Sequence, residues 1–342
     1  MTSWKFKLAG AALAAVTSLG AFAQEVTLRL HQFLPPQGTV PAKALTPWAK
    51  KIEADSKGRI KIQLYPSMQL GGTPPQLYDQ ARDGVVDIVW TLPGYTPGRF
   101  PKSEVFELPF MAGLSAEKTS RALWDYVQKN AMDEYKDVHV LALHTHGPGL
   151  FHTRQPITGL ESLRGMKIRG GTRVVNSMLT KLGATPVGMP VPAVTEALSK
   201  GVLDGTTIPW EVAPALKVQE LVKNHTSFAG DRALYVTTFV VAMNKNAYEK
   251  LPADLKKVID DNSGADFSAM IARTQDVGDE VGRNLAIKNG NKLTELEPAE
   301  VQRWRRTAGT VESEWIKSMQ DKGVDGARLV SEAKALIAKY DK

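Results

Sequence analysis

The sequence predicts an α/β fold, and three observations support this fold class. Through about residue 243, short segments with alternating apolar residues are followed by helical patterns. Strands that alternate with helices in this way form mostly parallel sheets covered on both faces. The rest of the chain is predominantly helical. The length of 342 residues is enough for two lobes of ordinary size or for one large domain.

The first series of elements runs to about residue 143. Its strands show period-two alternation, as in Ile60, Ile62 and Leu64, and its helices carry one apolar face. We expect strands at 26–30, 59–65, 85–92 and 138–143, and helices at 41–56, 74–83 and 116–135.

A second series begins near Leu150. We expect strands near 150 and at 166–168, 203–208 and 235–243, and helices at 172–182 and 191–200. The following pattern, 252–289, has no internal proline and would span roughly 50 Å as one helix. It should therefore break at Gly264 or Gly278, or cross from one lobe to another. Helices at about 298–322 and 327–340 end the chain.

The composition excludes several classes of site. The chain has no cysteine, so it can hold no disulfide, thiol nucleophile, cysteine–zinc site or iron–sulfur cluster. Its 43 Lys and Arg against 36 Asp and Glu give a net charge of +7. The densest basic group, Arg303, Arg305 and Arg306, is flanked by acidic residues. Nucleic-acid binders concentrate their positive charge on one stripe or arm, so we expect no nucleic-acid partner.

Residues 1–23 have the pattern of a secretory signal peptide. Lys5 and Lys7 precede a short apolar run, 8–20, and Ala21-Phe22-Ala23 forms an A-x-A cleavage site. The run is shorter than the ~20 residues that a membrane-spanning helix needs. We therefore predict cleavage after Ala23 and a mature chain in the periplasm of a Gram-negative cell, not inserted in the membrane. An uncleaved membrane anchor is the alternative.

Few catalytic motifs are present. The chain lacks G-x-S-x-G, a P-loop and H-E-x-x-H. His144, His146 and His152 form one cluster in sequence, and an H-x-H spacing on a strand places two imidazoles on one face. No Asp or Glu lies nearby in sequence to complete a ligand set. We predict no metal and no cofactor, and keep a periplasmic metal-dependent enzyme that uses these histidines as an alternative function.

Six short segments carry a family resemblance. They are 66–72 (PSMQLGG), 98–101 (GRFP), 107–110 (ELPF), 165–169 (GMKIR), 201–205 (GVLDG) and 251–255 (LPADL). In this order and spacing, after a secretory signal, they resemble the DctP-type substrate-binding proteins of TRAP (tripartite ATP-independent periplasmic) transporters. The resemblance covers essentially the whole mature chain.

This resemblance implies a two-lobed periplasmic binding protein with a ligand cleft between lobes joined by crossing strands and a long helix. Lobe I would comprise 24–147 plus 237–278, and lobe II 148–236 plus 279–342. The family is not enzymatic. Its partners are a small organic acid and a small and a large membrane subunit, with uptake driven by a sodium gradient. Presentation of the ligand to a membrane receptor is a second alternative.

Arg169 matches the family's arginine that holds the ligand carboxylate. The local pattern agrees, because Arg169 ends a predicted strand, where open α/β folds bind ligands. Gly170 and Gly171 then turn the chain, and Thr172 is a good N-cap for the next helix, whose N–H groups favour an anion. A guanidinium can also form two parallel charge-assisted bonds to a carboxylate.

The remaining predicted ligand contacts are mostly aromatic. They are Trp210, Trp90, Tyr95, Gln32, Phe33, Thr172, Tyr235 and His152. Sugar-acid-binding members of the family carry Asn before a proline where this chain has Ile208. One cation among several aromatic rings favours an aromatic monocarboxylate, or a 2-oxo or 2-hydroxy acid. A polyhydroxylated ligand would leave hydroxyl groups unpaired, at about 1–3 kcal/mol each.

Glu211 leaves one question open. Some relatives that bind 2-oxo acids hold a cation with a Trp-Glu pair similar to Trp210-Glu211. A solvated carboxylate at a helix start is equally natural, so we assign no metal to Glu211.

Overall fold

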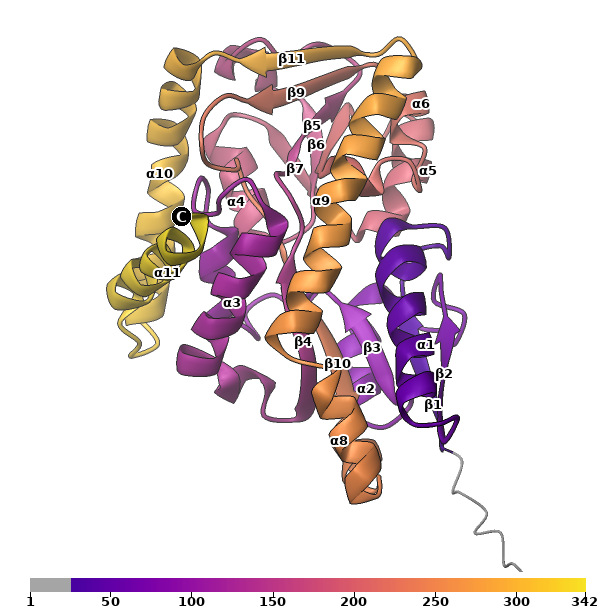
Figure 1. Cartoon of the computed structure of the whole chain (residues 1–342). Coiled ribbons are helices and arrows are strands. Elements are labelled where there is room, and N and C mark those ends of the chain that lie inside the picture. Colours follow the sequence, from indigo (N-terminus) through magenta and orange to yellow (C-terminus); the bar gives the residue numbers. More distant parts are fainter. Residues whose placement is uncertain (1–25) are drawn as a thin grey trace, which may run out of the picture.

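The computed structural model describes residues 26–342, which form two α/β lobes (Figure 1). Each lobe is built on one sheet. The predicted signal segment, 1–23, lies outside the described residues. In 26–342, no helix is long and apolar enough to cross a membrane.

The first sheet has the strand order β2-β1-β3-β10-β4. β1 pairs in parallel with β2 and β3, whereas β10 runs antiparallel to β3 and β4. The strands are β1 (Val26–Gln32), β2 (Ile60–Tyr65), β3 (Ile88–Thr91), β4 (Val138–Thr145) and β10 (Thr238–Asn244). The associated helices are α1 (Thr46–Asp55), α2 (Leu77–Arg82) and α3 (Ala116–Asn130). The predicted apolar face of α1 is buried, including Trp48 and Ile52.

The second sheet has the order β11-β9-β5-β8-β6-β7. Its strands are β5 (Leu150–Thr153), β6 (Lys167–Gly170), β7 (Thr185–Gly188), β8 (Gly205–Ile208), β9 (Asn224–Phe228) and β11 (Lys292–Leu296). Its helices are α4 (Arg173–Lys181), α5 (Val194–Ser199) and α6 (Val218–Leu221). β7, β9 and β11 were not predicted, because β7 contains a proline, β9 is largely polar and β11 is half-exposed at the sheet edge.

The chain passes between the sheets from β4 to β5, from β9 to β10, and along α9. The predicted helical pattern 252–289 breaks at Gly264, whose φ is 84°, into α8 (Ala253–Asp261) and α9 (Ala265–Lys288). The 24 residues of α9 span roughly 36 Å. The helix contacts α3 and β4 of the first lobe and the 3-10 turn η8 (Trp210–Val212) of the second. The long pattern therefore both breaks and crosses the lobes.

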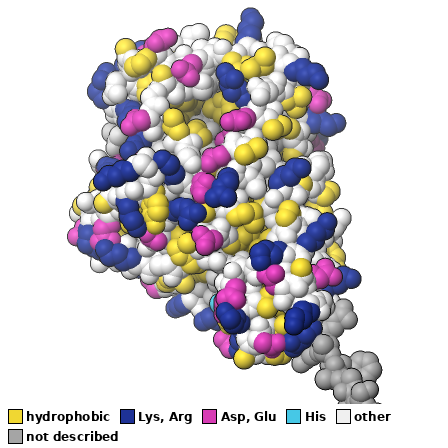
Figure 2. Space-filling view, viewed as in Figure 1, with side chains coloured by type: hydrophobic (Ala, Val, Ile, Leu, Met, Phe, Trp, Pro, Cys, Tyr) yellow, Lys and Arg dark blue, Asp and Glu magenta, His cyan; other side chains and the backbone are white. Residues whose placement is uncertain are grey.

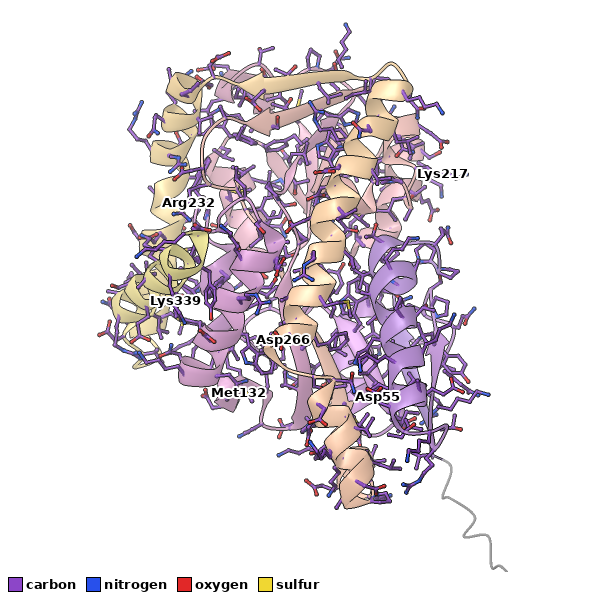
Figure 3. The ribbon with its side chains drawn as sticks, in the orientation of Figure 1. Asp55, Met132, Lys217, Arg232, Asp266 and Lys339 are labelled. Atoms are coloured by element: carbon purple, nitrogen blue, oxygen red, sulfur yellow. The ribbon has the colours of Figure 1, made fainter. Side chains whose placement is uncertain are left out.

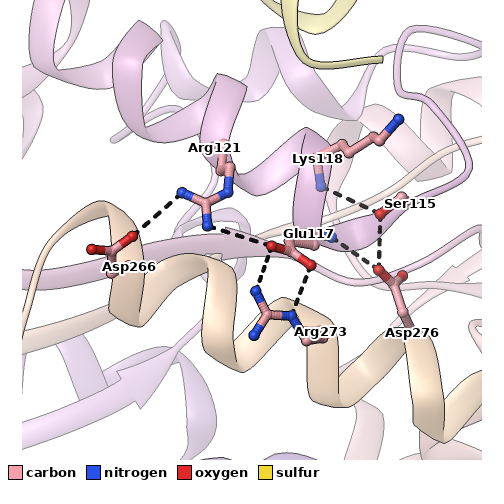
Figure 4. Close-up of polar contacts among 7 residues, drawn as sticks. All are labelled: Ser115, Glu117, Lys118, Arg121, Asp266, Arg273 and Asp276. Carbon is pink, nitrogen blue, oxygen red and sulfur yellow. Dashed lines mark hydrogen bonds and ion pairs between the residues drawn. The ribbon is translucent and has the colours of Figure 1, made fainter. Parts of the chain in front are cut away.

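The start of α3 is tied to α9 by buried and surface polar contacts (Figure 4). The Asp276 carboxylate accepts hydrogen bonds from the Ser115 hydroxyl at 2.9 Å and from the backbone N–H groups of Ala116 at 2.7 Å and Glu117 at 3.1 Å. Arg273 pairs with Glu117 one helical turn away. Because a carboxylate complements the free N–H groups and positive end of a helix, Asp276 fixes α9 to the first lobe.

The last two helices also contact both lobes. α10 (Pro298–Gln320) packs on α4, and α11 (Gly326–Asp341) packs on α3. Arg232, labelled in Figure 3, lies in the β9–β10 crossing and pairs with Asp341 of α11 at 2.7 Å. The C-terminal pair thus joins the outer surfaces of the two lobes.

Candidate ligand-binding site

A cavity lies between the two sheets, where the crossing segments meet. It holds about 450 Å³ of space outside protein atoms, including its opening to solvent. The first lobe contributes mainly aromatic rings to its wall. The second contributes the cation and most of the polar groups.

Arg169 is the cationic group of this cavity. It stands in β6, and its side chain is almost fully buried, with 4% of its surface exposed. The Nε–H donates to the carbonyl of Met189 at 2.9 Å, and Nη1 donates to the carbonyl of Thr207 at 3.3 Å. These bonds use two of the five N–H groups and fix the plane of the guanidinium. The other three N–H groups take no part in these two bonds.

A stack of rings forms the aromatic wall. The Trp90 indole lies between Phe33, at 4.9 Å between ring centroids, and Phe239, at 5.2 Å, with all three planes nearly parallel. The Trp90 Nε1–H donates to Nε2 of His144 at 2.9 Å, so the indole has its polar partner outside the cavity. The wall is therefore apolar and aromatic, which suits an aromatic ligand.

Tyr95 extends the aromatic wall to the opposite lobe. Its ring meets Phe33 edge-on, and its hydroxyl accepts the backbone N–H of Val191 at 3.0 Å. Burial raises the pKa of Tyr95, so the hydroxyl stays neutral.

His146 lines the cavity with both ring nitrogens engaged. Nδ1 lies 2.5 Å from the carbonyl of Gly147, and Nε2 accepts the N–H of Thr237 at 3.1 Å. These partners place the proton on Nδ1 of a neutral ring. Burial lowers the pKa of His146 to about 4. His146 therefore offers a neutral ring rather than a charge to a ligand.

Glu211 lines the same cavity from the second lobe. Its backbone N–H donates to Asp279 at 2.7 Å, and its Oε1 accepts the Nε2–H of Gln275 at 3.1 Å. Its Oε2 is buried without a partner. Burial raises the pKa of Glu211 to about 7. Close approach to α9 is possible because Gly282 has no side chain: a Cβ there would lie 2.2 Å from the Trp210 carbonyl oxygen.

Contacts between the lobes close the cavity. Arg173, at the start of α4, donates its Nε–H to Glu104 of the first lobe at 2.8 Å. Thr39 of the first lobe donates its hydroxyl to the Glu211 carbonyl oxygen at 3.0 Å. The structure is thus that of a closed cleft.

The structure brings five of the nine predicted contact residues to the cavity wall: Arg169, Trp90, Tyr95, Phe33 and Tyr235. Sequence reasoning missed Phe239, His146, Thr207 and Glu211 as wall residues. The alternation along 238–244 could have indicated Phe239.

The other four predicted residues have structural partners elsewhere. Gln32 bonds the backbone of Leu34 in both directions, and Thr172 caps α4 by accepting the N–H of Val175. His152 and Trp210 pack together, with ring centroids 4.9 Å apart. None of these four lines the cavity.

The three histidines of the alternative metal site are not brought together as ligands. His144 accepts the Trp90 N–H, and His152 pairs through Nδ1 with Nδ1 of His225 at 2.7 Å. Within residues 26–342, no group of three His, Asp or Glu side chains is arranged to hold a metal. The geometry does not favour the metalloenzyme alternative.

Two lobes that close over a buried arginine and an aromatic wall define a binding protein for a small organic anion. Comparison with known proteins agrees with this class. Residues 32–319 match the family model of DctP, the bacterial extracellular solute-binding proteins of family 7, and the chain belongs to this family.

Solved structures of TRAP solute-binding proteins are similar over nearly the whole chain. One from Rhodoferax ferrireducens, in complex with copurified benzoate, is 52% identical, with a TM-score of 0.90 over 92% of this chain and 98% of that one. One from a marine metagenome, with 3-hydroxybenzoate, is 51% identical, with a TM-score of 0.92 over 93% and 100%. One from Bordetella bronchiseptica, with bound mandelate, is 30% identical, with a TM-score of 0.85 over 92% and 99%.

Proposed function

We propose that this protein captures an aromatic monocarboxylate in the periplasm and delivers it to the membrane subunits of a TRAP transporter. The observation that carries the proposal is the pairing of Arg169 with the Phe33–Trp90–Phe239 stack in one closed cavity. The guanidinium would bind the carboxylate through two parallel hydrogen bonds, and the stack would cover the ring of the ligand.

The similar proteins support the same ligand class. Those described above bind benzoate, 3-hydroxybenzoate and mandelate, each an aromatic ring with one carboxylate. Mandelate is also a 2-hydroxy acid, so a short 2-hydroxy or 2-oxo arm between ring and carboxylate falls within the proposal. The apolar wall argues against sugar acids, whose hydroxyl groups would lie unpaired against it.

The mechanism follows from the division of the site between lobes. An open form would admit the ligand, Arg169 would take its carboxylate, and closure would bring the aromatic wall over the ring. The hinge would lie in the two crossings and along α9, consistent with lobes of 24–147 plus 237–278 and 148–236 plus 279–342. No step requires bond chemistry, so we propose a carrier rather than an enzyme, without metal or cofactor.

The partners and compartment follow from the family and the N-terminal pattern. We propose cleavage after Ala23, release into the periplasm, and docking of the closed form on the small and large membrane subunits. Lys and Arg are interspersed with Asp and Glu over the face shown in Figure 2, which supports the absence of a nucleic-acid partner. Sodium-dependent uptake of the ligand by membranes that carry all three components would separate transport from ligand presentation to a receptor.

A thermal-shift screen tests the ligand class. Purified protein would be unfolded and refolded to remove copurified ligand, then melted with aromatic monocarboxylates, 2-oxo acids, dicarboxylates and sugar acids. At a hundredfold excess over Kd, binding stabilises the fold by about 2.7 kcal/mol, which shifts the midpoint by several degrees. A shift with aromatic monocarboxylates supports the proposal. A shift with only dicarboxylates or sugar acids would overturn it.

A further inference from the structure

Glu211 differs from every other residue of the cavity wall. Among the wall residues, which all belong to the described part of the chain, it alone carries a buried polar side-chain atom without a hydrogen-bond partner, Oε2. An unpaired buried polar atom destabilises a fold by about 1–3 kcal/mol, so native structures rarely keep one. Such an atom on a ligand-cavity wall points to a partner that the ligand supplies.

Three other polar residues of the wall are already engaged by the protein. Arg169 is oriented by two backbone carbonyls, His146 uses both ring nitrogens, and the Tyr95 hydroxyl accepts a backbone N–H. A second polar group on the ligand would therefore meet Glu211 Oε2 or the hydroxyl group of Tyr235, and of these two only Oε2 is a buried atom without a partner.

The Glu211 carboxyl is held in place by α9. Gln275 donates to Oε1, so this oxygen is occupied and Oε2 is the free one. Asp279 accepts the backbone N–H of Glu211. α9 comes so close to Glu211 at Gly278 that a Cβ added to this glycine would lie 2.9 Å from the Cβ of Glu211. These contacts restrict the Glu211 side chain, which stands where the ligand cavity adjoins a second groove lined by Thr39 and Gly278.

Resting on the proposed function, we infer that Glu211 is a specificity-determining residue that selects aromatic monocarboxylates with a ring hydroxyl on the side remote from the carboxylate. The carboxylate would pair with Arg169 and the hydroxyl with Glu211 Oε2. The raised pKa of Glu211 suits this role, because a hydroxyl group can donate to the ionised carboxylate or accept from the protonated acid. A methyl group of similar size can do neither.

Calorimetric titration with matched ligands tests the inference. The probes are benzoate and the pairs of hydroxybenzoate and methylbenzoate substituted at ring positions 2, 3 and 4, each titrated into refolded wild-type protein. At position 3 or 4, the hydroxy compound should bind at least about tenfold more tightly than its methyl partner, since hydrogen bonds to charged groups commonly give this ratio or more. Position 2 should show no such preference, because that hydroxyl lies beside the carboxylate.

Variants assign the preference to Glu211. In Glu211→Met the ratio of the two Kd values should fall to about one, and in Glu211→Gln, whose amide keeps one polar partner, it should take an intermediate value. The control is Glu280→Gln, which removes an exposed carboxylate from α9, the helix that Glu211 contacts. This variant should keep the wild-type ratio. If the Met variant does not fold, the wild-type ratio and the Gln variant still decide.

Each failure has a distinct meaning. Tight binding of benzoate with equal affinity for the hydroxy and methyl partners would overturn the role of Glu211 and leave the proposed function intact. Affinity that depends on added Na⁺ or Mg²⁺ but not on the hydroxyl group would assign Glu211 to a cation and also overturn the inference. Absence of binding by every aromatic monocarboxylate would contradict the proposed function itself.

Discussion

The two walls of the cavity differ in chemistry. The wall from the first lobe is a stack of rings, Phe33, Trp90 and Phe239, whose polar atom is paired outside the cavity. The wall from the second lobe carries Arg169 and Glu211, both buried. The charged wall can attract and orient an anion in the open form, whereas the aromatic wall can contribute fully only after closure excludes water.

This division separates two properties of the site. We expect the second lobe to determine whether an acid binds, and the first lobe to determine how well its ring is covered. Substitutions in the two walls should therefore change the Kd by different factors, and different measurements should detect their effects.

Loss of the cation should have the largest effect. In Arg169→Ala, the Kd for benzoate should rise at least about a hundredfold, because a ligand carboxylate buried without its partner loses roughly 3–5 kcal/mol. Isothermal titration measures this directly. Arg164→Ala, which removes an exposed arginine of the same lobe, is the control and should keep the wild-type Kd. A Kd of Arg169→Ala for benzoate within threefold of the wild-type value would show that the charged wall does not determine binding.

Burial of Glu211 should appear in the pH dependence of stability. The pKa of Glu211 is raised to about 7 in the fold, from an ordinary value of 4.5, so the folded state holds its proton more tightly than the unfolded state does. The free energy of unfolding of wild type, relative to Glu211→Gln, should therefore fall as the pH rises from 4.5 through 7, by about 3 kcal/mol.

Urea unfolding at pH 5, 6, 7 and 8 measures this difference. The nearby Asp279 also has a raised pKa, for which burial is the main cause and repulsion by Glu211 a further one, so part of the fall reflects the pair. Glu280→Gln should run parallel to wild type. If the free energy of unfolding of Glu211→Gln also changed with pH in parallel with that of wild type, the Glu211 carboxyl group would be solvated in the fold.

Sequence reasoning could reach the fold and one half of this comparison. The alternating patterns predicted a mostly parallel sheet covered by helices, and the family resemblance implied two lobes. The helical stretch 252–289 predicted a helix that breaks or crosses between lobes, whereas β7, β9 and β11 were missed. Arg169 could be predicted from the sequence because a strand end, a glycine turn and an N-cap all lie in one segment. Trp210 was predicted as a ligand contact because it follows Ile208 and Pro209, where sugar-acid-binding relatives carry Asn before the proline, but its indole packs against His152 and His225 and does not line the cavity.

The role of Glu211 depends on contacts that no local pattern encodes. Its partners Gln275 and Asp279 lie more than 60 positions along the chain, on α9. His146 looked like a metal ligand in sequence, yet its ring nitrogens are occupied by the backbone of Gly147 and Thr237. Strand alternation shows on which face of the sheet a side chain lies but not which group it contacts there.

The aromatic wall should respond more mildly than the charged wall. In Phe239→Leu, the Kd for benzoate should rise about three- to tenfold, because an aromatic pair contributes roughly 0.5–1.5 kcal/mol beyond the area it buries. Phe106→Leu is the matched control, since Phe106 is a buried ring of the same lobe that packs on Tyr126 outside the cavity. It should lower the melting temperature and leave the Kd unchanged. Equal effects of both variants on Kd would mean that the stack acts through stability alone.

The smallest effect should come from the contact that joins the walls. Arg173 pairs with Glu104 across the cleft, but 38% of the arginine side chain is exposed, so solvent screens the pair. Breaking it with Arg173→Ala should lower the fraction of closed protein and thereby raise the apparent Kd for every ligand by the same factor, about two- to fivefold.

This uniformity distinguishes closure from recognition. Lys181→Ala is the control, because Lys181 on the same helix pairs with Glu314 of α10 and not across the cleft. Small-angle scattering of the ligand-free protein should show a larger radius of gyration for Arg173→Ala than for Lys181→Ala. If Arg173→Ala instead weakened the binding of one ligand selectively, Arg173 would take part in ligand recognition. The charged wall of the second lobe would then extend from Arg169 to Arg173 at the edge of the cleft.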